Sequence, residues 1–257
     1  LGDVYKRQVD YLIVDEAQDF NISDYKSHFA KRARKSLSLF GDTKQQMNSH
    51  GSNIKDIAEG LDSKQMSLDY NYRLPKAIAK VAQQIIGGGV DLMSNNQKDG
   101  GNSDYPNYPK PIITQYANPE KELEGILTRI QMEDLDDVAI LVPSDKEVMM
   151  VNDYLANHGI KTQVMYRTGN TVPFRTVNTL DFSNNDLPCI LTYYAAKGSE
   201  FDNVFVPFAN TSNDCSRNSF YVACTRSSRS LYISYSGTKT KYLSDVNSDF
   251  ITELKAA

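Results

Sequence analysis

Short apolar runs and amphipathic segments alternate along most of this chain. The first run, V-D-Y-L-I-V at residues 9–14, is rich in β-branched and aromatic side chains. It predicts a strand covered on both faces, as in a parallel sheet. The pattern then predicts a helix over residues 24–36 and a short strand over residues 36–40, which together make a parallel crossover. Helical spacing returns near residues 52–60 and over residues 75–86, where a proline suits the first turn.

Residues 87–109 interrupt this order with glycine, asparagine, aspartate and proline, so they predict a linker and the best domain boundary. Strands and helices alternate again beyond it, which predicts a second parallel α/β domain. The expected strands are 111–116, 137–142, 161–166, 189–194, 203–208 and 230–235, and the expected helices are 119–132, 145–158 and 217–227. Residues 9–86 are assigned to the first domain and residues 110–257 to the second. Residues 1–8 look like a translated sequencing-adapter tail and are excluded from fold reasoning.

Composition narrows the class of protein only modestly. A length of 257 residues allows one large or two ordinary domains, and 40% hydrophobic with 23% charged residues is typical of a soluble globular protein. The net charge of −4 shows no bulk preference for nucleic acid, although a local groove can still be basic. Three cysteines without metal-ligand spacing indicate a reducing cytoplasm, and no apolar run is long enough for a membrane span. The basic residues within 24–36 are interpreted as a solvated face.

Polar clusters follow several of the predicted strands. Asp15, Glu16 and Asp19 come directly after the first apolar run, at the carboxyl end of a strand, where parallel sheets bind ligands. The same residues also suit a turn or a helix N-cap, and this stretch alone leaves both interpretations open. The further clusters are G-D-T-K-Q at 41–45, N-Y-R at 71–73, T-Y-Y-A-A-K-G-S-E-F-D at 192–202 and Y-V-A-C-T-R at 221–226.

In this order, the five clusters resemble motifs II to VI of the superfamily 1 helicases of the UvrD/Rep/PcrA type, over residues 9–235. Each motif is modest alone, but the ordered set is specific. The resemblance implies an α/β fold with two RecA-like parallel-sheet domains of the P-loop NTPase type, the first incomplete. It implies an enzyme that couples ATP hydrolysis to movement along single-stranded DNA in the 3′→5′ direction and to unwinding. ATP would bind in the cleft between the two domains.

Three residues of the first domain take roles from this resemblance. Asp15 would hold the Mg²⁺ of Mg-ATP through water, because hard cations prefer carboxylate and water oxygens. Glu16 would be the general base or water positioner for attack on the γ-phosphate. Gln45 would sense the γ-phosphate or the attacking water.

Five further residues complete the ATP site implied by the resemblance. Tyr72 would stack on adenine, Gly198 and Glu200 would contact the nucleotide, and Glu200 would accept a hydrogen bond from the ribose. Arg73 and Arg226 would reach the γ-phosphate as arginine fingers. The residues themselves leave other interpretations open: both arginines could form surface salt bridges, Glu200 could begin a helix, and Tyr72 could be core.

Single-stranded or forked DNA is the partner that the resemblance implies. Thr192, Tyr194 and Lys197 fall on positions that would contact it. The family commonly has histidine where Tyr194 stands, and it has aromatic residues that stack on bases where this chain reads Q-M-N-S-H at 46–50. His50 could substitute in part, or it could simply be solvated.

Two absences shape the functional expectation. The sequence has no Gly-Lys pair and therefore no G-x-x-x-x-G-K-[ST] phosphate loop, so a truncated chain that is inactive alone is expected. Only about 22 residues separate Tyr166 from Cys189, which indicates a compact motor without an accessory helical domain. Two alternatives stay open. One is an ATP-hydrolysing switch or translocase subunit without unwinding, for example in phage defence; the other is a catalytically inactive nucleic-acid-binding module.

Overall fold

The computed structural model describes residues 8–68, 70–96, 98, 108–169, 175–211 and 215–256. Nearly all of the predicted adapter tail, and much of the predicted linker, lie outside these residues. The chain divides into two compact units, Leu1–Leu68 and Asp69–Ala257. Each unit is an α/β structure of its own.

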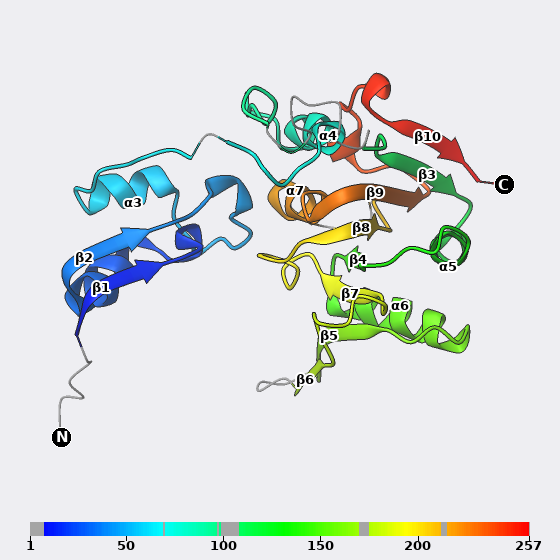
Figure 1. Cartoon of the computed structure of the whole chain (residues 1–257), viewed down its shortest axis with the longest axis horizontal. Coiled ribbons are helices and arrows are strands. Elements are labelled where there is room, and N and C mark those ends of the chain that lie inside the picture. Colours follow the sequence, from blue (N-terminus) through cyan, green and yellow to red (C-terminus); the bar gives the residue numbers. More distant parts are fainter. Residues whose placement is uncertain are drawn as a thin grey trace. The chain divides into compact units, whose positions relative to one another are not determined.

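The first unit is a two-stranded parallel sheet with short helices (Figure 1). Strand β1 (Val9–Val14) leads through η1 (Ala17–Asp19), α1 (Ile22–Asp24), η2 (Tyr25–Phe29) and α2 (Ala30–Arg32) to β2 (Ala33–Leu39), and η3 (Thr43–Gln45) and α3 (Ile54–Gly60) follow. Its core gathers around four buried side chains: Val14, Ala17, Tyr25 and Ile57. The expected βαβ step is therefore present.

Two details of this step differ from expectation. The prediction that β1 is covered on both faces is wrong for the described residues, because Tyr11 and Ile13 are 67% and 68% exposed. The predicted helix over 24–36 is also too long, because β2 begins at Ala33. Arg34 and Lys35, which looked like a solvated helical face, form ion pairs with Asp10 (2.5 and 2.9 Å). Pairing with the neighbouring strand therefore overrides the local helical pattern.

The second unit contains an eight-stranded sheet in the order β10-β3-β9-β8-β4-β7-β5-β6 (Figure 1). Every described pair of neighbouring strands in it is parallel except β5 and β6. The strands are β3 (Ile112–Tyr116), β4 (Val138–Val142), β5 (Gln163–Thr168), β6 (Arg175–Asn178), β7 (Cys189–Thr192), β8 (Phe201–Val206), β9 (Ser227–Ser236) and β10 (Thr252–Lys255). The predicted α/β class with a mostly parallel sheet is confirmed.

The described residues of this unit form four α-helices, α4 (Lys76–Ile86), α5 (Pro119–Met132), α6 (Asp145–Asn157) and α7 (Arg217–Cys224), and two short 3₁₀ helices, η4 (Lys241–Leu243) and η5 (Ser248–Phe250). The start of α5 follows from its cap, because the Asn118 side chain accepts a hydrogen bond from the Lys121 N–H (2.9 Å) and proline occupies the first turn. The core packs α5 and α6 against the central strands, with Ile140, Val151 and Ile190 fully buried. Helix α7 ends at Cys224, three residues before the predicted end.

Helix α4 was assigned to the first domain from the sequence, but it contacts α7 and β9 of the second unit. Its Ile85 carbonyl accepts a hydrogen bond from Arg217 (2.6 Å), and Gln84 accepts one from the Asn247 N–H (2.8 Å). The boundary between the two compact units therefore falls between Leu68 and Asp69. The linker at residues 87–109 stays a prediction. None of the helices that the structure describes is both long and apolar enough to cross a membrane.

Candidate functional site

The acidic end of β1 is a strained turn in the first unit. Glu16 adopts a left-handed backbone conformation (φ 52°, ψ 42°), which costs a non-glycine residue roughly 1 kcal/mol or more. Its N–H donates to Oδ1 of Asp15 (2.8 Å), so the turn holds two adjacent carboxylates at the carboxyl end of the strand. Strain of this kind is often found where side-chain direction matters for function.

Gln18 fixes this turn to the second polar cluster. The side chain is fully buried; its Nε2 donates to Oε2 of Glu16 (2.7 Å) and its Oε1 accepts from the N–H of Asp42 (3.0 Å). The NH₂ group of the Gln18 amide therefore contacts the D-E-A-Q-D motif, and its oxygen contacts the G-D-T-K-Q motif. Sequence reasoning gave Gln18 no role, although a polar residue between two carboxylates in D-E-A-Q-D was a usable signal.

Gln45 lies beside the same strand end. Its Nε2 donates to Oδ2 of Asp42 (3.1 Å), and Oδ1 of Asp42 accepts from the N–H of Lys44 (2.8 Å). Because β1 and β2 are parallel, their carboxyl ends share one edge, which carries Asp15, Glu16 and Gln45. The structure thus brings together the three residues predicted for this half of the site.

Two glycines permit this close packing. A Cβ at Gly41 would collide with Oε1 of Gln18, and a Cβ at Gly51 would collide with the backbone carbonyl of the same residue. The loop after Gln45 is therefore held against Gln18 by backbone contact. His50 is exposed in the turn just before Gly51.

Three predicted motifs converge on residues 198–200 of the second unit. Arg73 Nε lies 3.9 Å from Oε2 of Glu200, and both side chains are partly exposed. Arg226 is fully buried, and its Nη1 donates to the carbonyl of Ser199 (3.3 Å). Gly198 supplies the positive φ (82°) that the turn requires. The fold therefore brings Arg73, Glu200 and Arg226 to one turn.

Burial decides several of the open interpretations. Tyr72 is 69% exposed, so its interpretation as a core residue is wrong. Arg226 is no surface salt-bridge residue, since Nε donates to the Val222 carbonyl (3.0 Å) and Nη2 to Oγ1 of Thr225 (3.2 Å). Glu200 precedes β8 rather than beginning a helix.

One compact turn at the end of β7 holds three of the four residues predicted to contact nucleic acid, Thr192, Tyr194 and Lys197. The fourth, His50, belongs to the first unit. Thr192 ends the strand and its Oγ1 accepts from the N–H of Ala195 (3.1 Å). The N–H of Lys197 donates to the carbonyl of Tyr194 (3.2 Å), and the Tyr194 ring is 53% exposed. Tyr193 in the same turn is buried, and its ring lies edge-to-face with that of Phe220. This burial raises the pKa of Tyr193 well above the usual value.

A buried carboxyl group missed by sequence reasoning supports the second unit. Glu122 in α5 is fully buried, and its Oε2 accepts from the N–H of Phe208 (2.9 Å) and from Oγ of Ser234 (2.8 Å). Phe208 has a positive φ (60°), so this contact stabilises a strained turn just after β8. Burial raises the pKa of Glu122 and outweighs these hydrogen bonds, which lower it.

The raised pKa of Glu122 predicts a pH-dependent stability difference. Because the folded state binds the proton more tightly than the unfolded state, the wild-type free energy of unfolding falls as pH rises from about 4.5 through the folded-state pKa. Glu122→Gln removes this titration, so its stability relative to wild type is expected to increase over that range and then level off. Urea unfolding from pH 4 to pH 8 measures the difference. A constant offset between the two proteins would contradict the prediction.

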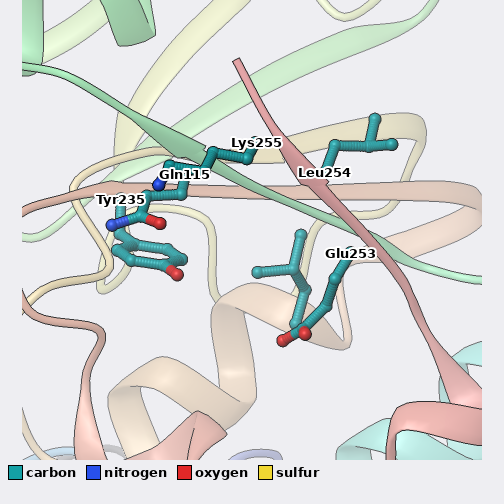
Figure 2. Close-up of a pocket in the computed structure, with 6 residues that line it drawn as sticks. Gln115, Tyr235, Glu253, Leu254 and Lys255 are labelled. Carbon is teal, nitrogen blue, oxygen red and sulfur yellow. The ribbon is translucent and has the colours of Figure 1, made fainter. Parts of the chain in front are cut away.

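A shallow cavity of about 190 Å³ lies beside β10, which is an edge strand of the sheet (Figure 2). Figure 2 shows Gln115, Tyr235 and Glu253 around it. Glu253 already forms an ion pair with Lys239 (2.8 Å). The residues that line the cavity include none of the predicted site residues, so it does not enlarge the candidate site.

Comparison with known proteins supports the resemblance. Residues 188–234 match the UvrD-like helicase C-terminal domain, a segment that includes the turn at Thr192–Glu200 and Arg226. The ATP-dependent DNA helicase Rep of Buchnera aphidicola subsp. Baizongia pistaciae (strain Bp) is 27% identical over 199 residues, which cover 72% of this chain. The chain spans about a quarter (27%) of that relative's length.

Solved structures of helicases are also similar in part. The C-terminal domain of a possible DNA helicase from Lactobacillus plantarum WCFS1 matches 71% of this chain and 98% of its own length, at 21% identity and a TM-score of 0.49. Arterivirus nonstructural protein 10, a helicase solved with DNA, matches 56% of this chain and 35% of its own, at 8% identity and a TM-score of 0.40.

Proposed function

We propose that this chain is part of the motor of an ATP-driven, single-stranded DNA translocase or helicase. The observation that carries the proposal is the convergence of Arg73, Glu200 and Arg226 on the turn at residues 198–200. One guanidinium beside a partly exposed carboxylate, with a second guanidinium bound to the neighbouring backbone carbonyl, suits a nucleotide, because its phosphates need positive charge and its ribose offers hydroxyl donors.

In this proposal the second unit binds one side of ATP. Tyr72 stacks on the base, Glu200 accepts a hydrogen bond from the ribose, and Gly198 lets the backbone approach. Arg73 exchanges its long contact with Glu200 for the γ-phosphate, and Arg226 stabilises charge on the same group. Neutralisation of the transferred phosphoryl group by arginine is worth on the order of 10³ or more in rate.

In the same proposal, the strand-end edge of the first unit carries the residues that act on the attacking water. Glu16 takes the proton of the attacking water, Gln45 orients that water, and Gln18 positions Glu16. The Asp15 carboxylate is exposed, and Mg²⁺ favours one or two carboxylates, several waters and substrate phosphates. Within the described ranges, no group of three or more His, Cys, Asp or Glu side chains could hold a metal by itself. Bound Mg²⁺ would neutralise phosphate charge.

Single-stranded or forked DNA lies, in the same proposal, across the turn with Thr192, Tyr194 and Lys197, with His50 contributing from the first unit. Backbone phosphates suit Lys197 and a base suits the exposed Tyr194 ring. Net movement is 3′→5′, as the resemblance implies. The chain has no phosphate loop of the G-x-x-x-x-G-K-[ST] pattern, so we assign the activity to a longer cytoplasmic protein and expect this chain alone to be inactive.

A second candidate is an ATP-hydrolysing switch or translocase subunit that does not unwind DNA. The loop after Gln45 favours it, because residues 46–49 include no aromatic side chain that could stack on a base. His50 is the one residue of the segment 46–50 with a ring. The short segment between β5 and β7 favours it as well, since its described residues hold only β6 and a loop.

The test compares ATP hydrolysis with strand displacement in the full-length protein that contains this chain. We expect ATP hydrolysis that is stimulated by single-stranded DNA, together with displacement of a strand from a duplex with a 3′ tail. Stimulated hydrolysis without displacement on either tail polarity would support the second candidate. Absence of stimulated hydrolysis would contradict both and leave an inactive nucleic-acid-binding module.

A further inference from the structure

Two exposed arginines lie at one end of the β5–β6 pair, beside the turn that follows Thr192. Strands β7, β5 and β6 are successive neighbours in the sheet (Figure 1). The parallel register of β5 and β7 pairs Met165 with Leu191, so Arg167, two residues further along β5, is level with the start of the turn after β7. Arg175 begins β6 at the same end, because β5 and β6 are antiparallel. The carboxyl edge of the sheet therefore carries both arginines next to this turn.

The two arginine side chains project from opposite faces of the β5–β6 pair. Residues that are paired across an antiparallel ladder share a face, and neighbours along a strand alternate between faces. Arg167 is paired with Thr176, whereas Arg175 is paired with Thr168, the residue after Arg167. Both arginines are exposed. A polymer that crosses this end of the pair therefore meets one guanidinium on each side.

The segment around both arginines is basic. Residues 154–180 include Lys161, Arg167 and Arg175 but no Asp or Glu, although the whole chain has a net charge of −4. None of the ion pairs between described residues involves Arg167 or Arg175. Within the part of the chain that the structure describes, both positive charges therefore face solvent and suit an anionic ligand.

We propose that this end of the β5–β6 pair, with Arg167 and Arg175, is an additional contact for the backbone phosphates of single-stranded DNA. The inference deepens the proposed function and rests on it. Neighbouring strands are about 4.8 Å apart, so β7 and β6 are separated by about 10 Å, which a few nucleotides span. The exposed Tyr194 ring then offers a surface for a base, and Lys197, Arg167 and Arg175 form a row of cations along the strand ends. Surfaces that bind single strands combine aromatic rings and positive charge in this way.

A competing explanation is protection of the sheet edge. Strand β6 is an edge strand, and charged side chains on such strands prevent them from pairing with another chain. Under this explanation, Arg167 and Arg175 keep the protein monomeric and do not contact DNA. The two explanations differ in whether loss of both charges weakens DNA binding or promotes self-association.

The experiment measures binding of a fluorescein-labelled oligothymidylate to the 257-residue protein by fluorescence anisotropy, over a range of salt concentrations. The test variant carries Arg167→Gln and Arg175→Gln. The charge-matched control carries Lys161→Gln and Arg229→Gln, at two exposed positions near the amino ends of β5 and β9. We expect the test variant to bind about 10-fold more weakly at about 0.1 M salt, and its salt slope (log K against log salt) to fall by about 0.7 for each lost phosphate contact. The control should bind like the wild type, and Arg167→Lys with Arg175→Lys, which keeps both charges, should bind nearly as well.

Four outcomes would overturn the inference. Equal weakening in the test variant and the charge-matched control would reduce the effect to net charge. Binding that is weakened by Lys197→Gln but unchanged in the test variant would mean that DNA crosses the turn without reaching the β5–β6 pair, and the proposed function would stand. A test variant that binds like the wild type but sediments as larger species would assign both arginines to edge protection. Wild-type protein that does not bind oligothymidylate would contradict this contact together with the nucleic-acid surface of the proposed function.

Discussion

Replacing Glu16 with glutamine is expected to lower DNA-stimulated ATP hydrolysis by at least about 100-fold in the full-length protein that carries this chain. Glutamine keeps the shape of the side chain and can still accept the hydrogen bond that Gln18 donates (2.7 Å in the wild type). The left-handed turn that presents residue 16 is therefore retained. What is lost is the ability to take a proton from water, so kcat should fall while the affinity for ATP changes little.

The matched control for this substitution is Glu59→Gln, which neutralises an exposed carboxylate of α3 outside the strand-end edge. It should hydrolyse ATP like the wild type. Hydrolysis measured with saturating single-stranded DNA, beside nucleotide binding, separates chemistry from affinity. Undiminished hydrolysis in Glu16→Gln would mean that Glu16 is not the base, and the proposed mechanism would fail at its central step.

Local patterns predicted much of the fold because their causes are local. Helix α5 begins where expected since Asn118 caps it and proline occupies its first turn. The strands of the second unit are found from their apolar runs, whereas β6 and β10 were not predicted. Both are short edge strands of mostly polar and exposed residues, so neither shows the apolar run of a buried strand. The partner of β10, which is β3, is also distant in sequence, and long-range pairing of this kind leaves little local signal.

The candidate site shows the same difference between what local sequence predicts and what depends on distant contacts. Motif spacing identified Arg73 and Glu200, which the structure brings to 3.9 Å. The sequence did not reveal that Gln18 connects two motifs or that Glu122 supports the turn at Phe208, because both roles depend on burial. A buried polar residue must find partners, but its own segment does not say which ones.

Replacing Arg226 with lysine is expected to reduce ATP hydrolysis about 1,000-fold in the full-length protein, the lower end of the effect of an arginine finger. Arg226 ends the segment V-A-C-T-R and donates through three nitrogens: Nε to Val222, Nη1 to Ser199 and Nη2 to Thr225. Lysine keeps the charge, but its single ammonium group cannot reproduce this planar arrangement. The charge is therefore no longer held at the turn that carries Glu200.

The same contacts give Arg226 a structural role that must be measured separately. Arg226 is fully buried and two of its acceptors, on Val222 and Thr225, are buried with it, so Arg226→Ala should lower the free energy of unfolding by roughly 3 kcal/mol because these acceptors lose their donors. Arg226→Lys should lower the free energy of unfolding by less. The control Arg229→Lys, at an exposed position three residues later, should leave it almost unchanged.

ATP hydrolysis per folded molecule, measured beside thermal unfolding, separates the structural role of Arg226 from its role in hydrolysis. If Arg226→Lys unfolds earlier but hydrolyses ATP at the wild-type rate while folded, the guanidinium serves the turn alone. A 1,000-fold loss in fully folded protein would instead require that it acts on the phosphate.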